Sequence, residues 1–301
     1  MVKRPLGNTG FMIAPVVYGS IVSMGEPQDV SDEYVSWALD HGVNYFDVAP
    51  TYGDSEEKLG RSLGSRRKDV YIACKTSCRL RKDAEKEMYE SLERLRTDYF
   101  DVYQLHSITT DKDVDEVFGT GGVMELMVEA KEKGLTRKVG ITAHSEKAAL
   151  RCLELYPFDT VLFPFNWGLN LGQGIGNALM AEAKKRNMGV ISIKSMIHRR
   201  WLSVEEVERS RFPKSWCKPI DLERPDFRNA AIKYVFAIGV DAIVPPGDFV
   251  NFSYAVENID KCLSEPLMEE DLALLQRELV AVGDNWFFDI DGKMKGVLRT
   301  T

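Results

Sequence analysis

The chain has 301 residues, 44% hydrophobic and 28% charged, which is typical of a folded globular protein and excludes a disordered or fibrous one. Its 39 Lys and Arg against 46 Asp and Glu give a net charge of −7, which argues against binding to nucleic acid. We expect a cytoplasmic protein, because no apolar stretch approaches the roughly 18 residues of a membrane span and no signal-peptide core is present. The five cysteines are scattered, so we expect free thiols and no metal site.

Short apolar runs alternate with helical patterns along most of the chain. Eight strands are predicted, at residues 16–20, 43–47, 70–75, 100–105, 138–141, 160–163, 190–193 and 242–244. Strands that alternate with helices run parallel, and eight such units predict one (β/α)8 TIM barrel domain over 1–301. A doubly wound open sheet is the alternative, but no Gly-x-Gly-x-x-Gly fingerprint follows the first strand.

Three segments lie outside this alternation. Turn residues at Gly7 and Asn8 predict an N-terminal hairpin, and spaced leucines predict an extra helix over 268–282. The segment 196–225, after the seventh strand, is too long for an ordinary connection. It is either a binding loop, which its position favours, or a small insertion with secondary structure of its own.

Four polar side chains lie at or just after predicted strand ends. Asp47, Lys75 and His106 end strands two, three and four, and Tyr52 follows Asp47 by five residues. Because the C-terminal ends of barrel strands converge on one cleft, we expect these residues to meet there. A nearby ammonium lowers the pKa of a tyrosine from about 10, so Lys75 is interpreted as tuning Tyr52 and Asp47 as holding Lys75. His106 would donate a hydrogen bond to a carbonyl oxygen.

Each of these residues also has a simpler interpretation. Asp47 and Lys75 could form a structural ion pair, Tyr52 could be a loop aromatic, and His106 could cap a strand. Their joint placement favours a proton-transfer site.

Four segments of the sequence resemble the aldo/keto reductase family. The segments are residues 4–19, 42–53 with Ser55-Glu56 and Leu59-Gly60, 72–75, and 98–106. The resemblance implies a (β/α)8 barrel, NADP(H) or NAD(H) as cofactor, and a catalytic tetrad. In that tetrad Tyr52 is the general acid, Lys75 and Asp47 tune it, and His106 orients the carbonyl.

The resemblance also implies a cofactor site. Its candidate residues are Gly19, Ser20, Asp47, Thr142, Asn166, Lys194, Gly247, Asp248, Glu257 and Asn258. Two amides that usually hold the nicotinamide carboxamide are replaced, by Ala143 and Leu162. Asn166 can both donate and accept hydrogen bonds, and we interpret it as a substitute.

Further departures fall after strands seven and eight. Lys194 occupies the neighbourhood of a stacking aromatic and would approach the cofactor phosphates, or else is a solvated strand-end lysine. Tyr254 stands where an arginine commonly binds the 2′-phosphate, and Asp248 where a cation is expected. Since a carboxylate repels a phosphate, NADH should be tolerated better than in typical members.

These residues predict a metal-free enzyme that interconverts an aldehyde or ketone with an alcohol. Besides Tyr52, Ile21, Trp167 and Trp201 are expected to line the substrate cleft, which takes a small molecule. The alternative is a cofactor-binding regulatory or interaction protein with little turnover, and a barrel lyase or isomerase is a third interpretation.

Overall fold

The structure, a computed structural model, describes residues 1–212, 214–295 and 297. Eight parallel strands form one sheet in the order β12-β9-β8-β7-β6-β5-β4-β3. They are β3 (Tyr18–Gly19), β4 (Tyr45–Asp47), β5 (Tyr71–Thr76), β6 (Phe100–Ile108), β7 (Thr136–Ala143), β8 (Thr160–Phe163), β9 (Gly189–Ile193) and β12 (Ala242–Val244). The predicted strands are confirmed, with ends that differ by a few residues.

The two edges of the sheet meet beside β3. Val16 pairs with Ile243 in parallel register, and the Val17 and Ile243 amides donate to the carbonyl oxygens of Ile243 and Pro15, both at 2.9 Å. This contact closes the sheet into a barrel, so the predicted (β/α)8 architecture is confirmed and the open sheet is excluded.

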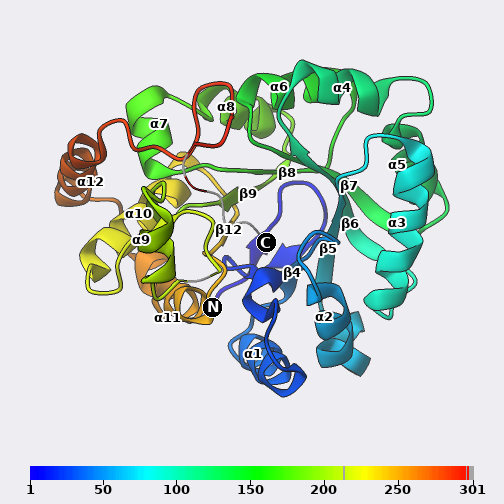
Figure 1. The fold of residues 1–301 in the computed structure, drawn as a ribbon, viewed down its shortest axis with the longest axis horizontal. Coiled ribbons are helices and arrows are strands. Elements are labelled where there is room, and N and C mark those ends of the chain that lie inside the picture. Colours follow the sequence, from blue (N-terminus) through cyan, green and yellow to red (C-terminus); the bar gives the residue numbers. More distant parts are fainter. Residues whose placement is uncertain (213, 296, 298–301) are drawn as a thin grey trace.

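Helices surround the barrel (Figure 1), and most of them connect successive strands. They are η1 (Ser20–Ser23), α1 (Gln28–Asp40), α2 (Ser55–Leu63), η2 (Gly64–Asp69), α3 (Arg81–Arg94), α4 (Asp111–Phe118), α5 (Val123–Glu132), α6 (Glu146–Leu155), α7 (Trp167–Gln173), α8 (Asn177–Lys185), α9 (Val204–Glu208), α10 (Pro225–Ile238), α11 (Phe249–Ser264) and α12 (Glu269–Val282). Apolar side chains on α3, such as Met88 and Leu92, are buried against the barrel.

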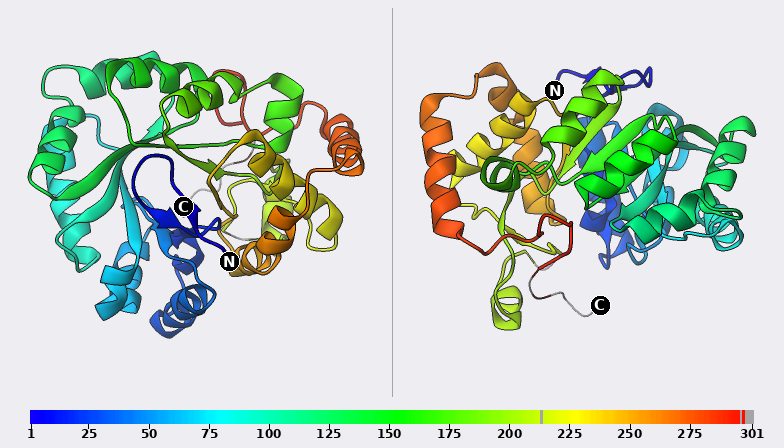
Figure 2. Two further views of the ribbon diagram at one scale, coloured as in Figure 1. Left: turned by 180° about the vertical axis from the view of Figure 1, so that it is seen from behind. Right: turned by 90° about the horizontal axis from the view of Figure 1, so that it is seen from above.

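An N-terminal hairpin closes one end of the barrel. β1 (Arg4–Pro5) pairs antiparallel with β2 (Met12–Ile13), as predicted. Leu6, Phe11 and Ile13 are buried in a cluster with residues of the barrel interior. The side view in Figure 2 shows this hairpin and α9 at opposite ends of the molecule.

The segment 196–225 has structure of its own. β10 (Ile197–Arg199) pairs antiparallel with β11 (Lys218–Pro219), and α9 lies between them. The predicted extra helix is α12, which packs against α10 and α7. After α12 the chain returns to the barrel, where Trp286, Phe287 and Phe288 are buried.

Within the described residues, no helix combines the length and apolar character that crossing a membrane requires. The same residues contain no group of three or more His, Cys, Asp or Glu able to hold a metal ion.

Candidate active site

A cavity opens at the C-terminal ends of the barrel strands. It is bordered by residues of all eight barrel strands, including Leu162 of β8, together with residues 214–217 from the segment after β9. Asp47, Tyr52, Lys75 and His106 all line it, so the barrel brings the predicted tetrad positions together.

A buried ion pair forms the floor of this cavity. Lys75 Nζ lies 2.6 Å from Asp47 Oδ2 and donates to the Val48 carbonyl oxygen at 3.0 Å. Neighbouring strands β4 and β5 carry the two side chains, which explains why residues far apart in sequence meet. Burial alone would lower the pKa of Lys75, but Asp47 and Tyr52 outweigh it and the pKa is raised. The ammonium therefore stays charged.

Tyr52 lies directly above this pair, on the connection between β4 and α2. Its side chain is 7% exposed, and Lys75 Nζ is 4.9 Å from the centre of its ring. The ring centre of His106 is 6.0 Å away. Burial raises the pKa of Tyr52, and Lys75 opposes that shift only in part. The sequence reveals the lysine but not the burial of the ring, so the predicted lowering of the Tyr52 pKa is wrong.

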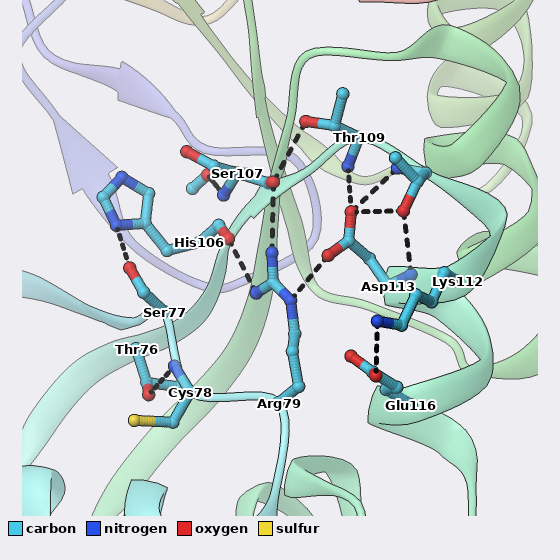
Figure 3. A network of polar contacts seen from close by, with 12 residues as sticks. Thr76, Ser77, Cys78, Arg79, His106, Ser107, Thr109, Lys112, Asp113 and Glu116 are labelled. Carbon is cyan, nitrogen blue, oxygen red and sulfur yellow. Dashed lines mark hydrogen bonds and ion pairs between the residues drawn. The ribbon is translucent and has the colours of Figure 1, made fainter.

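His106 is fixed by contacts to the loop after β5. Its Nδ1 is 3.1 Å from Ser77 Oγ, a hydrogen bond that Figure 3 marks with a dashed line. Burial and the positive charges of Lys75, Arg79 and Lys194 lower the pKa of His106 to about 3. The imidazole is therefore neutral at physiological pH.

Arg79 anchors the backbone at this strand end. It donates to the carbonyl oxygens of His106 at 2.9 Å and Ser107 at 3.2 Å, and to Asp113 Oδ1 at 2.9 Å (Figure 3). Ser107 has a φ of +54°, an unusual conformation for a residue other than glycine. Its amide donates to Thr142 Oγ1 at 2.8 Å. Sequence reasoning missed Arg79, which lies in a loop without a recognisable motif.

The candidate cofactor residues divide into two groups. Gly19, Asp47, Thr142, Lys194 and Gly247 line the cavity. Five others lie outside its lining: Ser20, Asn166, Asp248, Glu257 and Asn258.

Asn166 is fully buried at the start of α7. Its Oδ1 accepts from the amides of Gly168 and Leu169, while its Nδ2 donates to the carbonyl oxygens of Lys194 and Ile197. The side-chain amide is thus occupied by backbone groups, and its position is that of a helix cap that also fixes the chain after β9.

The start of α11 borders the same end of the barrel. Asp248 is its N-terminal cap residue and accepts from the Lys214 amide at 3.3 Å. The guanidinium of buried Arg228, on α10, lies 3.9 Å from the centre of the Tyr254 ring and donates to Asn251 Oδ1 at 2.9 Å. A cation therefore does lie beside Tyr254, but it comes from another helix.

The tryptophans are arranged differently from the expectation. Ile21 lines the cavity, but Trp167 and Trp201 do not. Both are buried, and their indole N–H groups donate to the carbonyl oxygens of Ile197 and Ser215. Trp216, 44% exposed, lines the cavity instead, with its ring centre 6.3 Å from that of Tyr52.

The cavity fits a bound nucleotide with hydroxyl groups. Asp47 Oδ1, in the cavity lining, is buried without a hydrogen-bond partner among the described residues, so it can accept from a donor of a ligand. A Cβ added to Gly247 would lie 2.5 Å from Ile21 Cγ2, and one added to Gly19 would lie 2.9 Å from Val244 Cγ1. Glycine at these positions lets the backbone border the cavity closely.

The fold and the site define a (β/α)8 barrel with a tyrosine, lysine, aspartate and histidine site at the mouth. The chain belongs to the aldo/keto reductase family, whose model, described as "Aldo/keto reductase family", matches residues 21–212.

Individual relatives agree with this family. The chain is 32% identical over 157 residues to the uncharacterized oxidoreductase YqkF of Bacillus subtilis, covering 48% of this chain and 49% of the relative. It is 31% identical over 212 residues to L-galactose dehydrogenase of Arabidopsis thaliana, covering 63% of each. The chain thus spans about half of the first relative and just under two thirds of the second.

A solved structure shows the same fold. An aldo-keto reductase from Klebsiella pneumoniae in complex with NADPH superposes with a TM-score of 0.67, covering 92% of this chain and 95% of that one. At 19% identity, this likeness establishes the fold alone.

Proposed function

We propose that this protein is an NAD(P)H-dependent oxidoreductase that interconverts an aldehyde or ketone with the corresponding alcohol. The observation that carries the proposal is the buried Asp47–Lys75 pair beneath Tyr52, with neutral His106 beside the same ring. Membership of the family and the NADPH complex of a protein of the same fold support it.

The site residues divide the chemistry among them. When bound, the nicotinamide supplies a hydride to the carbonyl carbon. Tyr52 donates its phenolic proton to the carbonyl oxygen, and its raised pKa keeps that proton in place at neutral pH. Lys75 stabilises the phenolate that remains, and Asp47 keeps Lys75 charged.

His106 orients the carbonyl oxygen by hydrogen bonding. When the Ser77 hydroxyl donates to Nδ1, the proton of the neutral ring is on Nε2, which can then donate to the substrate. A neutral donor does not compete with Tyr52 for the proton transfer.

The cofactor would lie along the cavity toward α11. Asp47 Oδ1 would accept from one of its hydroxyl groups, and the backbone at Gly19 and Gly247 would border it. The N-terminus of α11 favours negative charge because its first amides point outward. Asp248 there and Arg228 behind it act in opposite directions on a 2′-phosphate, and acceptance of NADH stays a prediction.

Replacement of Tyr52 by phenylalanine tests the proposal. With a panel of neutral aldehydes and ketones and either cofactor, Y52F should lower kcat by about 10²- to 10⁴-fold, because the general acid is lost. NADPH binding, measured by fluorescence, should change by less than about threefold, since the ring is retained.

Two results would contradict this scheme. NADPH binding without turnover of any carbonyl compound would favour the regulatory alternative. Turnover by Y52F at the rate of the original protein would remove Tyr52 from the chemistry.

A further inference from the structure

Lys194 is a cavity-lining lysine that the mechanism above does not use. It directly follows β9 and has a φ of +63°, a left-handed conformation that residues other than glycine adopt at some cost. Asn166 Nδ2 holds its carbonyl oxygen at 2.8 Å, which maintains this backbone. The strained conformation is thus built into the barrel.

The ammonium of Lys194 has no anionic partner among the described residues. Its Nζ lies 5.3 Å from the centre of the Phe288 ring and 5.9 Å from that of Trp216. The other two lysines of the cavity are paired, Lys75 with Asp47 and Lys214 with Glu26. Asp47 is also the one carboxylate among the lining residues.

The neighbouring histidines do not change this charge balance. Burial and the charges of Lys75, Arg79 and Lys194 lower the pKa of His106, and burial and Lys194 lower the pKa of His144, so both rings are neutral near pH 7. A half-buried positive charge without a counter-charge is unfavourable, and an anion brought in by a ligand would relieve it.

Trp216 contacts both Lys194 and Tyr52, the residue at the reacting end of the cavity. The same indole ring contacts Tyr52, at 6.3 Å between ring centres, and the Lys194 ammonium, at 5.9 Å. A substrate whose carbonyl group reaches Tyr52 can lie along this ring and present its other end to Lys194.

We propose that Lys194 binds the carboxylate of the substrate, so that the preferred substrates are aldehydes or ketones that also carry a carboxylate. Trp216, which lines the cavity, would pack on the carbon atoms between the two groups, while buried Phe288 supports the Lys194 side chain from behind. This inference rests on the proposed function and narrows its substrate class. A cofactor phosphate is the other anion that could reach Lys194, and the experiment separates the two.

The test compares 4-carboxybenzaldehyde with benzaldehyde, which differ only in the carboxylate. The ratio of their kcat/KM values is measured for the original protein and for K194M, K194R and K214M. We expect the ratio to favour the acid and to fall about tenfold or more in K194M, because a hydrogen bond to a charged group is lost. K194R should recover most of the ratio, and K214M, which removes a lysine already paired with Glu26, should change it less than about twofold.

Binding measurements make the test independent of turnover. Calorimetric titration of the NADP-bound protein with benzoate and with benzamide should show a benzoate preference that K194M removes. If no carbonyl compound is turned over but this preference is found, the proposed function fails while the anion site stands.

Two outcomes would overturn the inference. One is turnover in which the ratio of kcat/KM for 4-carboxybenzaldehyde to kcat/KM for benzaldehyde is the same in the original protein and in K194M. The other is a K194M defect that appears equally with both aldehydes and in the Kd for NADPH, which would assign Lys194 to a cofactor phosphate.

Discussion

Arg79 sets the geometry of the site without lining the cavity. Its guanidinium connects the carbonyl oxygens of His106 and Ser107 to Asp113 on α4 (Figure 3). Three donors in a fixed plane can hold these acceptors at once, which a flexible lysine ammonium cannot reproduce. Arg79 is therefore a positioning residue for His106.

Replacement of Arg79 by methionine should lower kcat about tenfold, with a smaller effect on the Kd for NADPH, because His106 loses its alignment. Steady-state kinetics and fluorescence titration measure the two quantities. R79K should recover only part of the rate. A matched control is K112M, which breaks the exposed Lys112–Glu116 pair on the neighbouring helix. Equal losses in R79M and K112M would contradict the positioning role.

At the residue scale, the sequence predicts those site residues whose position depends only on where a barrel strand ends. Asp47, Lys75 and His106 lie at or within two residues of strand ends, so the barrel alone brings them together. Arg79 and Trp216 lie on loops whose paths no local pattern specifies, and Arg79 escaped notice for that reason. The path of a loop also decides the position of Trp201. Its aromatic side chain suits a cleft, but it is buried outside the cavity, where the indole N–H donates to the Ser215 carbonyl oxygen.

At the scale of elements, the segment after α12 packs behind one wall of the cavity, against the lining residues Lys194 and His144. Phe288 contacts both Lys194 and His144, at 5.3 Å from the ammonium and 4.6 Å between ring centres. Gly292 follows with a φ of +78°, and a Cβ there would lie 2.4 Å from the backbone of His144. The segment can pack this closely only with glycine at that position.

Replacement of Gly292 by alanine should displace this segment and raise the KM for carbonyl substrates at least about threefold, because Phe288 is no longer held. G283A is the matched control: Gly283 also has a positive φ, +56°, but a Cβ there meets nothing within 4 Å. G283A should cost about 1 kcal/mol of stability with little change in KM. Similar KM values for both variants would refute the contact.

Element ends were predicted less well than elements. Asp54 is the N-terminal cap residue of α2 and is of a residue type common there, but its carboxylate accepts from the Gly25 amide and pairs with Lys58 instead of capping the helix. Local spacing identifies a helix start, whereas the partner of the capping side chain depends on a loop that is distant in sequence.

At the scale of the molecule, buried histidines make stability sensitive to acid. The pKa of His106 is about 3 in the folded protein and near 6.5 in an unfolded chain. Below about pH 6.5 the unfolded state therefore binds a proton that the folded state does not, so stability falls as the pH falls toward 3.

Between pH 7.5 and pH 5, His106 should account for a loss of about 2 kcal/mol in the free energy of unfolding. Urea unfolding at several pH values measures this quantity. Over the same pH range, the free energy of unfolding of H106Q should fall by about 2 kcal/mol less than that of the original protein. H41Q, a variant of an exposed histidine, should behave like the original protein. Identical pH dependence for H106Q and the original protein would refute the assignment.

The barrel joins segments from the two ends of the chain. Val16 pairs with Ile243, and the cavity takes Gly19 and Ile21 from one end and residues 244–247 from the other. During synthesis, β12 leaves the ribosome only after the other seven strands. Until then, the edges of β3 and β9 that face β12 in the barrel stay unpaired. The nascent chain is therefore vulnerable to aggregation at these edges until β12 has been made, and a fragment that ends before β12 would lack the part of the candidate site that residues 244–247 supply.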